Sequence, residues 1–359
     1  MASNRTVWRL LDTGERRAAE NIALNQTLLS GRQQGITPPT LRFLGFQPSA
    51  LLGFHQSAAQ ELNLDYCRSN RITVQRRITG GGALYCDNRQ LGWELYLHKR
   101  ELGTADMAAI AQRICVAVAG GISQLGIDAR FRPRNDLEVQ GRKIGGTGGA
   151  FDGDAILYQG TLLIDFDVEL MLRVLNIPAE KLSDKSVASA RERVTSLAEL
   201  LGSAPGRDVV VTLIADALAK EFDVEMSVGE LNSEEQQLYN EALAQIDHPD
   251  WVDMLTHPAS DRPVLTAVHK FGGGLLRVNI AYDIAHHRMK QVWFSGDVFI
   301  SPRRTLIDLE AVLRDSSAER METIVREFFQ TRTVDMLGLT PADIVSLLSQ
   351  AIATTGVTA

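Results

Sequence analysis

Apolar residues recur at helical spacing in several parts of the chain. Between residues 105 and 125, Met107, Ile110, Ile114 and Val118 lie three or four positions apart, which predicts an amphipathic helix. Thr340 followed by Pro341 is typical of a helix start and predicts a final helix from that point. Further helices are predicted over residues 15–30, 168–202, 208–223 and 306–313.

Alternation of apolar and polar residues marks the strands. Leu276, Val278 and Ile280 alternate with polar neighbours and predict a half-buried strand. Other strands are predicted within 40–54, as a pair around a turn, and at 91–97, 137–139, 162–166 and 292–294. Because helices and strands are mixed without strict alternation, the pattern favours an α+β fold over a doubly wound sheet.

The chain is long enough for two domains. It has 359 residues, and apolar periodicity weakens over 228–262, where Asp247 to Asp250 is typical of a linker. We therefore predict a catalytic-size domain at 1–246, a linker at 247–262 and a C-terminal domain at 263–359.

Charge and composition narrow the function classes. Against 37 basic residues stand 44 acidic ones, a net charge of −7, and no long basic run is present, which argues against binding nucleic acid through its phosphates. No apolar stretch approaches the ~20 residues of a membrane span, and the first residues lack a signal-like apolar core. The three cysteines have no regular spacing, so neither a disulfide framework nor a zinc site is indicated. We expect a cytoplasmic protein with no membrane or nucleic-acid partner.

Two stretches carry candidate chemistry. The first runs Arg76-Arg77-Ile78-Thr79-Gly80-Gly81-Gly82-Ala83-Leu84-Tyr85. Glycines let a backbone approach a ligand closely, and its N–H groups beside guanidinium groups suit a phosphate or carboxylate. The spacing is neither that of a P-loop nor that of a dinucleotide fingerprint. Taken alone, such a run is more often a tight turn.

The second stretch is a predicted hairpin with Gln140-Gly141 near its turn. Lys143 follows the turn, and an ammonium group there can neutralise a phosphate or a carboxylate during a reaction. Taken alone, a solvated lysine is the simpler interpretation.

Both stretches together, in this order and with Asn135-Asp136 between them, resemble the lipoate–protein ligase family. That family carries an Arg-Arg-x-Ser/Thr-Gly-Gly-Gly-Ala loop, then Asn-Asp, then Gly-x-Lys-Ile/Val-x-Gly. Looser matches extend the resemblance over most of the chain, at 12–24, 160–163, 189–197 and 272–299. The resemblance implies a mixed or antiparallel catalytic domain of the biotin/lipoate ligase type, with a smaller α/β accessory domain after it.

The resemblance also implies a two-step activity. Lipoate is activated with ATP and Mg²⁺ to lipoyl-AMP, and the lipoyl group then passes to a lysine of a carrier domain. The acceptor would be the lipoyl domain of a 2-oxoacid dehydrogenase E2, the glycine-cleavage H protein, or a related lipoate-binding protein of sulfur oxidation. Both steps gather negative charge, so they need fixed cations and N–H donors with water excluded.

Site residues follow by matching motif positions. Lys143 matches the family lysine that contacts lipoate and the adenylate phosphate, and Asn135 and Asp136 match a pair beside the phosphates. Asp136 is the expected magnesium ligand, since magnesium prefers carboxylate and phosphate oxygens. The expected nucleotide-binding residues are Arg77, Thr79, Gly80, Gly81, Gly82, Ala83, Leu84 and Tyr85. Thr161 is expected to line the same site, while Arg76 is either a second phosphate contact or a surface charge.

Departures from the family pattern keep alternatives open. Cys86 stands where the family often has histidine. Either this thiol reshapes the acyl pocket, or Cys86 is simply a small buried hydrophobe. Related octanoyltransferases use a cysteine thioester and no ATP, with the cysteine after the lysine motif; here Cys67, Cys86 and Cys115 all precede Lys143.

The runner-up function is therefore an octanoyl or lipoyl transferase that takes its acyl group from a carrier protein. A non-catalytic lipoate-binding paralogue is a further alternative. A biotin ligase is disfavoured, because its Gly-Arg-Gly-Arg-x-Gly loop is missing.

Overall fold

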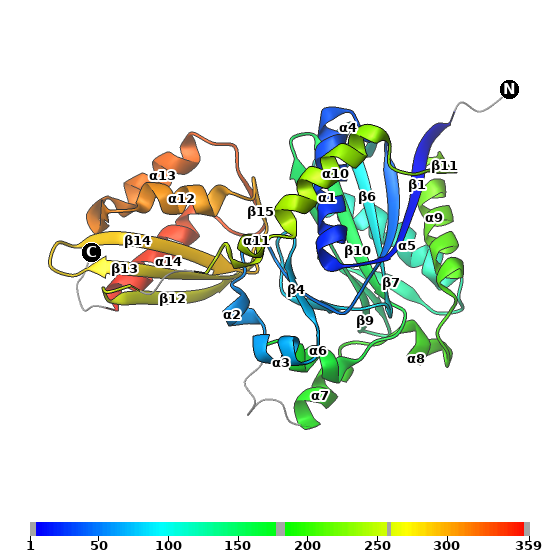
Figure 1. The fold of residues 1–359 in the computed structure, drawn as a ribbon, viewed down its shortest axis with the longest axis horizontal. Coiled ribbons are helices and arrows are strands. Elements are labelled where there is room, and N and C mark those ends of the chain that lie inside the picture. Colours follow the sequence, from blue (N-terminus) through cyan, green and yellow to red (C-terminus); the bar gives the residue numbers. More distant parts are fainter. Residues whose placement is uncertain (1–4, 177–183, 257–259, 355–359) are drawn as a thin grey trace. The chain divides into compact units, whose positions relative to one another are not determined.

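The computed structural model describes residues 5–176, 184–256 and 260–354, with side chains from 188 onward in the middle segment (Figure 1). The chain folds into two compact units. The first comprises Met1–Leu51, Leu62–Gln75 and Leu84–Trp251, and the second comprises Leu52–Glu61, Arg76–Ala83 and Val252–Ala359. The second unit thus joins two short early segments to the C-terminal part of the chain. The predicted boundaries at 246 and 263 assign both early segments to the first domain, and these boundaries stay a prediction.

An eight-stranded mixed sheet forms the centre of the first unit, in the order β11-β1-β2-β6-β10-β9-β8-β7. The strands β11, β1 and β2 run parallel, and each later neighbour in the order is antiparallel. Their bounds are β1 (Thr6–Arg16), β2 (Thr40–Phe46), β6 (Gln90–His98), β7 (Ala129–Arg132), β8 (Asp136–Val139), β9 (Arg142–Asp152), β10 (Ala155–Leu163) and β11 (Val224–Val228). A small second sheet has the order β4-β3-β5, with β3 (Ser49–Leu52), β4 (Thr73–Arg76) and β5 (Leu84–Cys86).

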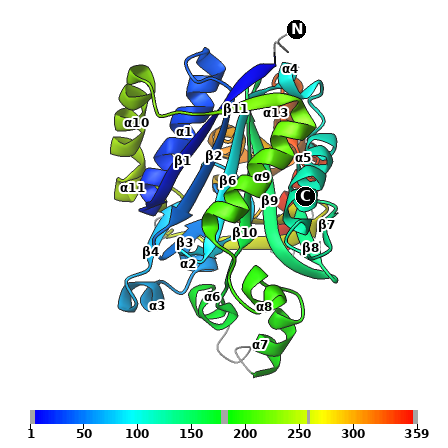
Figure 2. The same ribbon diagram turned by 90° about the vertical axis from the view of Figure 1, so that its right-hand side faces the viewer.

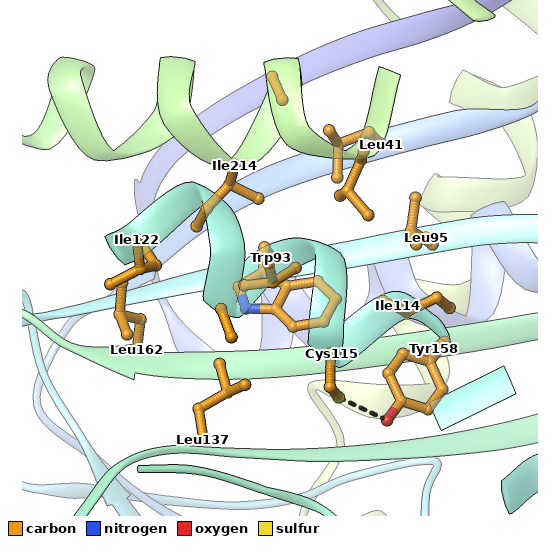
Figure 3. Close-up of a cluster of buried hydrophobic side chains, with 14 of the residues drawn as sticks. Leu41, Trp93, Leu95, Ile114, Cys115, Ile122, Leu137, Tyr158, Leu162 and Ile214 are labelled. Atoms are coloured by element: carbon orange, nitrogen blue, oxygen red, sulfur yellow. Dashed lines mark hydrogen bonds between the residues drawn. The ribbon is translucent and has the colours of Figure 1, made fainter. Parts of the chain in front are cut away.

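Helices cover both faces of the large sheet, as Figure 2 shows. On one face lie α1 (Ala18–Gln34) and α10 (Ser233–Ile246), and on the other lie α5 (Met107–Ser123) and α9 (Arg207–Phe222). The shorter helices are α3 (Leu64–Ser69), α4 (Lys99–Leu102), α6 (Val168–Val174), α7 (Asp184–Arg191), α8 (Leu197–Leu201) and α11 (Pro249–Asp253). The main apolar core lies under α5 and α9, around Trp93, Ile114 and Ile214 (Figure 3).

The second unit contains an antiparallel sheet in the order β12-β13-β14-β16, with helices packed on it. The strands of the second unit are β12 (Val264–Phe271), β13 (Gly274–Asp283), β14 (Arg288–Gly296), β15 (Ile300–Ser301), β16 (Ser316–Ser317) and β17 (Asp335–Met336). Of these, β15 and β17 pair with each other in a separate two-stranded sheet. Its helices are α2 (Ala58–Glu61), α12 (Thr305–Leu313), the 3-10 helix Ala318–Arg320, α13 (Met321–Gln330) and α14 (Pro341–Ala353). Leu276, Val278 and Ile280 are buried in its core, as their alternation predicts.

The structure confirms the α+β class and several predicted elements. The helix over 105–125 is α5, and Thr340 caps α14 by accepting the Asp343 N–H. Other predictions were wrong in detail, among them the strand expected at 162–166, which ends at Leu163. The first helix starts at Ala18 rather than residue 15, because β1 runs to Arg16.

Residues 168–202 were predicted to be helical throughout, but residues 192–196 separate α7 from α8, and 177–183 lie outside the described residues. The break has a physical cause, since this stretch pairs with the backbone of Lys143. The helices α10 and α11 form within 228–262, where the periodicity of apolar residues is weak. The strands β1 and β11 were not predicted. Among the described residues, no helix has both the length and the apolar character needed to cross a membrane.

Candidate active site

Lys143 lies on the predicted hairpin, next to its turn. Gln140 and Gly141 both have positive φ, 52° and 79°, as a tight two-residue hairpin turn requires. The Lys143 N–H donates to the Arg193 carbonyl at 2.8 Å, and its own carbonyl accepts the Thr195 N–H at 2.9 Å. Both backbone groups of Lys143 are therefore held by residues 193–195, while its side chain stays 35% exposed.

A β-bulge sets the direction of the Lys143 side chain. Leu137 pairs with Gly145 but Glu138 pairs with Lys143, so Ile144 is an extra residue on β9. Bulges re-aim side chains in this way. As a result, Lys143 and Gly146 face the same side although they are three positions apart, and a Cβ on Gly146 would lie 2.8 Å from Lys143 Nζ.

Asp136 holds two cations. Its Oδ1 lies 2.7 Å from Lys143 Nζ, and its Oδ2 accepts a hydrogen bond from Arg132 Nη2 at 2.6 Å. Burial raises the pKa of Asp136, but Lys143 and Arg132 outweigh burial and the net pKa is lowered. Arg132 also pairs with Glu138 at 3.1 Å. The carboxylate is thus ionised and fixes the ammonium group over Gly146.

A row of paired residues crosses the sheet at this level. Asp136 pairs with Gly146, Gly146 with Thr161, and Thr161 with Gly92. Directly paired residues point to the same face, so Thr161 lies on the face that carries the Lys143 ammonium group. The two glycines leave the floor of this row without side chains. The structure therefore brings Lys143, Asp136 and Thr161 together, as the sequence led us to expect.

Asn135 has a different use from the expected phosphate contact. Its side-chain Nδ2 donates to the Thr147 carbonyl at 3.0 Å, and its own carbonyl accepts the Thr147 N–H at 2.8 Å. In this structure Asn135 fastens the chain entering β8 to β9, and its predicted role beside the phosphates stays a prediction.

The glycine loop belongs to the second unit, where Arg76 is completely buried. Its guanidinium group donates to the carbonyls of Phe54 at 2.9 Å, Gln56 at 2.5 Å and Val252 at 2.6 Å. Burial lowers the pKa of Arg76 to about 10. Neither a surface charge nor a phosphate contact describes this residue, because its donors are engaged by backbone oxygens.

Arg77 is also buried and stabilises its own loop. Its Nη2 donates to the carbonyls of Gly80 at 3.0 Å and Gly82 at 2.9 Å. Thr79 is buried as well, and its carbonyl accepts the Phe54 N–H at 2.9 Å. These contacts hold a preformed loop, and nucleotide binding by Arg77 and Thr79 stays a prediction.

The three glycines of the loop differ in what surrounds them. A Cβ on Gly80 would lie 2.3 Å from the Val298 carbonyl oxygen, and one on Gly81 would lie 2.9 Å from the Phe299 ring, at a φ of 91°. Gly82 has no positive φ, and a Cβ there would meet no atom within 4 Å. Packing and backbone conformation explain Gly80 and Gly81, whereas Gly82 leaves room for something else.

The remaining predicted loop residues lie where the chain passes from the second unit to the first. Ala83 closes the second unit's segment, Leu84 is 42% exposed, and Tyr85 is buried. The Tyr85 hydroxyl donates to Asp87 at 3.1 Å. The exposed Leu84 suits a ligand contact better than Tyr85 does.

All three cysteines are buried, and none follows Lys143. Cys86 packs with Ala18 and Leu51 as a small hydrophobe. Burial raises the pKa of Cys67, and burial also raises the pKa of Cys115, where the contacts with Tyr158 and Thr147 act in the opposite direction. A buried thiol with a raised pKa is a poor nucleophile.

No cluster of three or more histidine, cysteine or acidic side chains suited to a metal occurs in the part of the chain that the structure describes. Both carboxylate oxygens of Asp136, the expected magnesium ligand, are engaged by cations, and its role toward magnesium stays a prediction. His286 is exposed, and its Nδ1 lies 3.1 Å from Asp283 Oδ2.

Sequence reasoning missed Arg132 and Thr147. Arg132 lies four positions before Asp136, and only the closure of the β7–β8 hairpin brings the two together. Thr147 follows the lysine motif directly, but nothing in the sequence distinguishes it from other strand threonines.

Comparisons with known proteins agree with this geometry. Residues 17–223 match the model of the lipoyl protein ligase A/B catalytic domain. Over 268 residues the chain is 27% identical to octanoyltransferase LipM of Kyrpidia tusciae, covering 68% of this chain and 97% of that protein.

Two solved structures are similar. One is the bi-partite lipoate protein ligase of Thermoplasma acidophilum, studied with its E2 lipoyl domain; it is 25% identical with a TM-score of 0.62, over 71% of this chain and 99% of that one. The other is P. falciparum LipL1 in complex with lipoate, with 15% identity and a TM-score of 0.69, over 95% of this chain and 98% of that one. The second likeness concerns the fold alone and extends through the C-terminal part.

Proposed function

The chain belongs to the lipoyl protein ligase A/B catalytic-domain family, and we propose that within it this protein is an ATP-dependent lipoate–protein ligase. One observation carries the choice of ligase over transferase. Cys67, Cys86 and Cys115 are all buried, so the chain offers no exposed thiol for an acyl-thioester intermediate. An acyl-adenylate needs no protein nucleophile, only fixed positive charge.

In the proposed reaction a lipoate carboxylate oxygen attacks the α-phosphorus of ATP. Pyrophosphate leaves with the electron pair of the broken P–O bond, and lipoyl-AMP remains. Lys143 neutralises the charge that develops on the phosphate and acyl oxygens. Asp136 keeps the ammonium group in place, and the absence of a side chain at Gly146 gives the substrate room.

The second step transfers the acyl group. A lysine amine of the carrier attacks the acyl carbon, forms the amide, loses a proton, and AMP leaves. The acceptor we propose is a lipoyl domain of the E2 type, as studied with the Thermoplasma acidophilum ligase, or another of the lipoate carriers named above. Magnesium would accompany ATP, with Asp136 supplying an oxygen once one of its two ion pairs opens.

Octanoyl transfer is the second candidate, because the chain is similar to a LipM protein over nearly the whole length of that protein. In such a reaction the acyl group arrives as a carrier thioester, and ATP is not required.

The deciding experiment follows pyrophosphate release with ATP, magnesium and either lipoate or octanoate. We expect release that depends on the acyl substrate, followed by lipoylation of an added lipoyl domain. Acyl transfer from acyl-carrier protein that ignores ATP would replace the ligase proposal with the transferase. Lipoate binding without either reaction would replace it with a non-catalytic role.

A further inference from the structure

A line of buried polar groups runs beneath the lysine site, on the opposite face of the same strands. Cys115 of α5 lies with its Sγ 3.2 Å from the Tyr158 hydroxyl on β10, and Figure 3 shows this contact inside the apolar core. The Tyr158 hydroxyl lies 2.8 Å from Thr147 Oγ1 on β9. Thr147 Oγ1 donates in turn to the Asn135 carbonyl at 3.1 Å.

The direction of the protons along this line follows from what each group can do. A carbonyl only accepts, so the single hydroxyl proton of Thr147 goes to Asn135. The Tyr158 proton then goes to Thr147, because an oxygen at 2.8 Å is a better acceptor than the sulfur. The oxygen of Tyr158 is left to accept from the Cys115 thiol. The order is therefore Cys115 to Tyr158 to Thr147 to Asn135.

Burial makes this order rigid. Cys115 and Tyr158 are at most 1% exposed, and Thr147 is 8% exposed. Their neighbours in the core are apolar side chains such as Leu137, and the other polar atom near the thiol is Thr147 Oγ1, at the longer distance of 3.6 Å. A buried hydroxyl without a partner is unfavourable, and each group in the line therefore holds the next in one orientation.

The line ends one residue before Asp136. Asn135 is bound to Thr147 at three points: through the Thr147 N–H, through its hydroxyl, and through the Asn135 side chain to the Thr147 carbonyl. This clamp fixes the start of β8, just beyond the bulge that directs Lys143. The position of the Asp136 carboxylate, and with it that of the Lys143 ammonium group, depends on this clamp.

We propose that Thr147 and Tyr158 are positioning residues, which act through Asn135 and Asp136 to hold Lys143 at the reacting phosphate. The proposal rests on the proposed function for its substrate, and on the five contacts above for its geometry. It also gives Cys115 a role as the terminal donor of the line rather than as a nucleophile.

Hydroxyl deletions test the proposal. Thr147→Val and Tyr158→Phe each remove one hydroxyl with little change in shape, and Thr147→Ser restores the hydroxyl. Matched controls are Thr27→Val and Tyr282→Phe, whose buried hydroxyls have no partner within the described residues. Pyrophosphate release gives kcat and KM for each variant, and thermal unfolding reports the folded fraction.

We expect kcat to fall by about tenfold to hundredfold in Thr147→Val and Tyr158→Phe, with KM for lipoate and ATP within about twofold of wild type. Thr147→Ser should regain most of the rate. Values of kcat equal to those of the two controls would overturn the proposal, and so would a Thr147→Ser variant as slow as Thr147→Val, because a merely structural role lowers stability without changing kcat of the folded protein.

A spectroscopic measurement tests the line without turnover. The infrared S–H stretching band of Cys115, identified by its loss in Cys115→Ala, should move to higher frequency in Tyr158→Phe, where the thiol loses the nearer of its two oxygen neighbours and keeps only the weaker contact at 3.6 Å. An unchanged band would show that the proton order is wrong. If wild type releases no pyrophosphate, the ligase proposal fails separately, and the same variants are then compared in acyl transfer from acyl-carrier protein, with the same loss of kcat expected.

Discussion

The hairpin around Lys143 and the glycine loop around Arg77 contain similar residues and use them in opposite ways. In the hairpin, the cation is 35% exposed and paired with a carboxylate above a floor of glycines. In the loop, both arginines are buried and bound to backbone carbonyls. Basic residues beside glycines therefore do not by themselves identify where a cation meets a ligand.

The difference lies in the acceptors. A cation that is paired with a carboxylate such as Asp136 can exchange this partner for another anion. The carbonyls around Arg76 carry no net charge and lie within the fold, so Arg76 has no such exchange open to it. The hairpin is thus suited to act on charge that changes during a reaction. The loop is suited to present a fixed backbone, with Gly82 as its open position.

The largest effect should come from Lys143→Ala. Removing the ammonium group leaves developing phosphate charge unneutralised, and we expect pyrophosphate release to fall by roughly 10²–10³-fold with the fold retained. Arg142→Ala is the matched control, because Arg142 pairs with Glu199 at the surface and should leave the rate unchanged. Equal activity of both variants would remove the reactive role from the hairpin.

Arg76→Met should affect stability rather than chemistry. The substitution leaves several buried carbonyls without donors, at about 1–3 kcal/mol for each unsatisfied group, so we expect a loss of at least ~3 kcal/mol in unfolding free energy. Urea unfolding measures it. A variant that stays as stable as wild type but loses ATP affinity would make Arg76 a ligand contact and remove the contrast between the two regions.

Glu310 adds a pH dependence to the second unit. Its Oε1 accepts the Phe294 N–H at 2.7 Å, and burial raises its pKa to about 7, although that bond and Arg314 act against the rise. Because the folded pKa lies above the ordinary value, stability present at low pH should be lost as the pH rises from about 4.5 to about 7. A shift of this size corresponds to about 3 kcal/mol.

Glu310→Gln keeps an acceptor for Phe294 and removes the charge. Unfolding of the variant measured from pH 4.5 to pH 8 should lack this loss, so that it exceeds wild type in stability at pH 8. Parallel profiles for both proteins would show that Glu310 titrates normally.

The smallest effects are expected from alanine substitutions at Gly81 and Gly82, which should act on different properties of the protein. Gly81→Ala places a Cβ at a φ of 91° and against Phe299, which should cost about 1–3 kcal/mol of stability. Gly82→Ala fits without contact, so its stability should stay within ~0.5 kcal/mol of wild type. We expect it instead to raise KM for ATP about tenfold. An unchanged KM would mean that the loop does not approach the nucleotide at Gly82.

Particular residues show how far sequence reasoning reached. The hairpin turn at Gln140-Gly141 and the helix α5 follow from local patterns, and the family motif located Lys143 and Asp136. Arg132 was out of reach, because its contact with Asp136 depends on how β7 and β8 close. The burial of Arg76 was also out of reach, since its acceptors lie 20 or more positions away along the chain.

The sequence by itself determined the α+β class, the family and the residues that carry charge, because periodicity and motif spacing are local properties of the chain. Tertiary structure alone decided which of those charges are free to act. The bulge at Ile144 turns Lys143 toward Asp136, and the carbonyls of Phe54, Gln56 and Val252 engage Arg76. Both outcomes depend on contacts between distant segments, and such contacts form only when the chain folds.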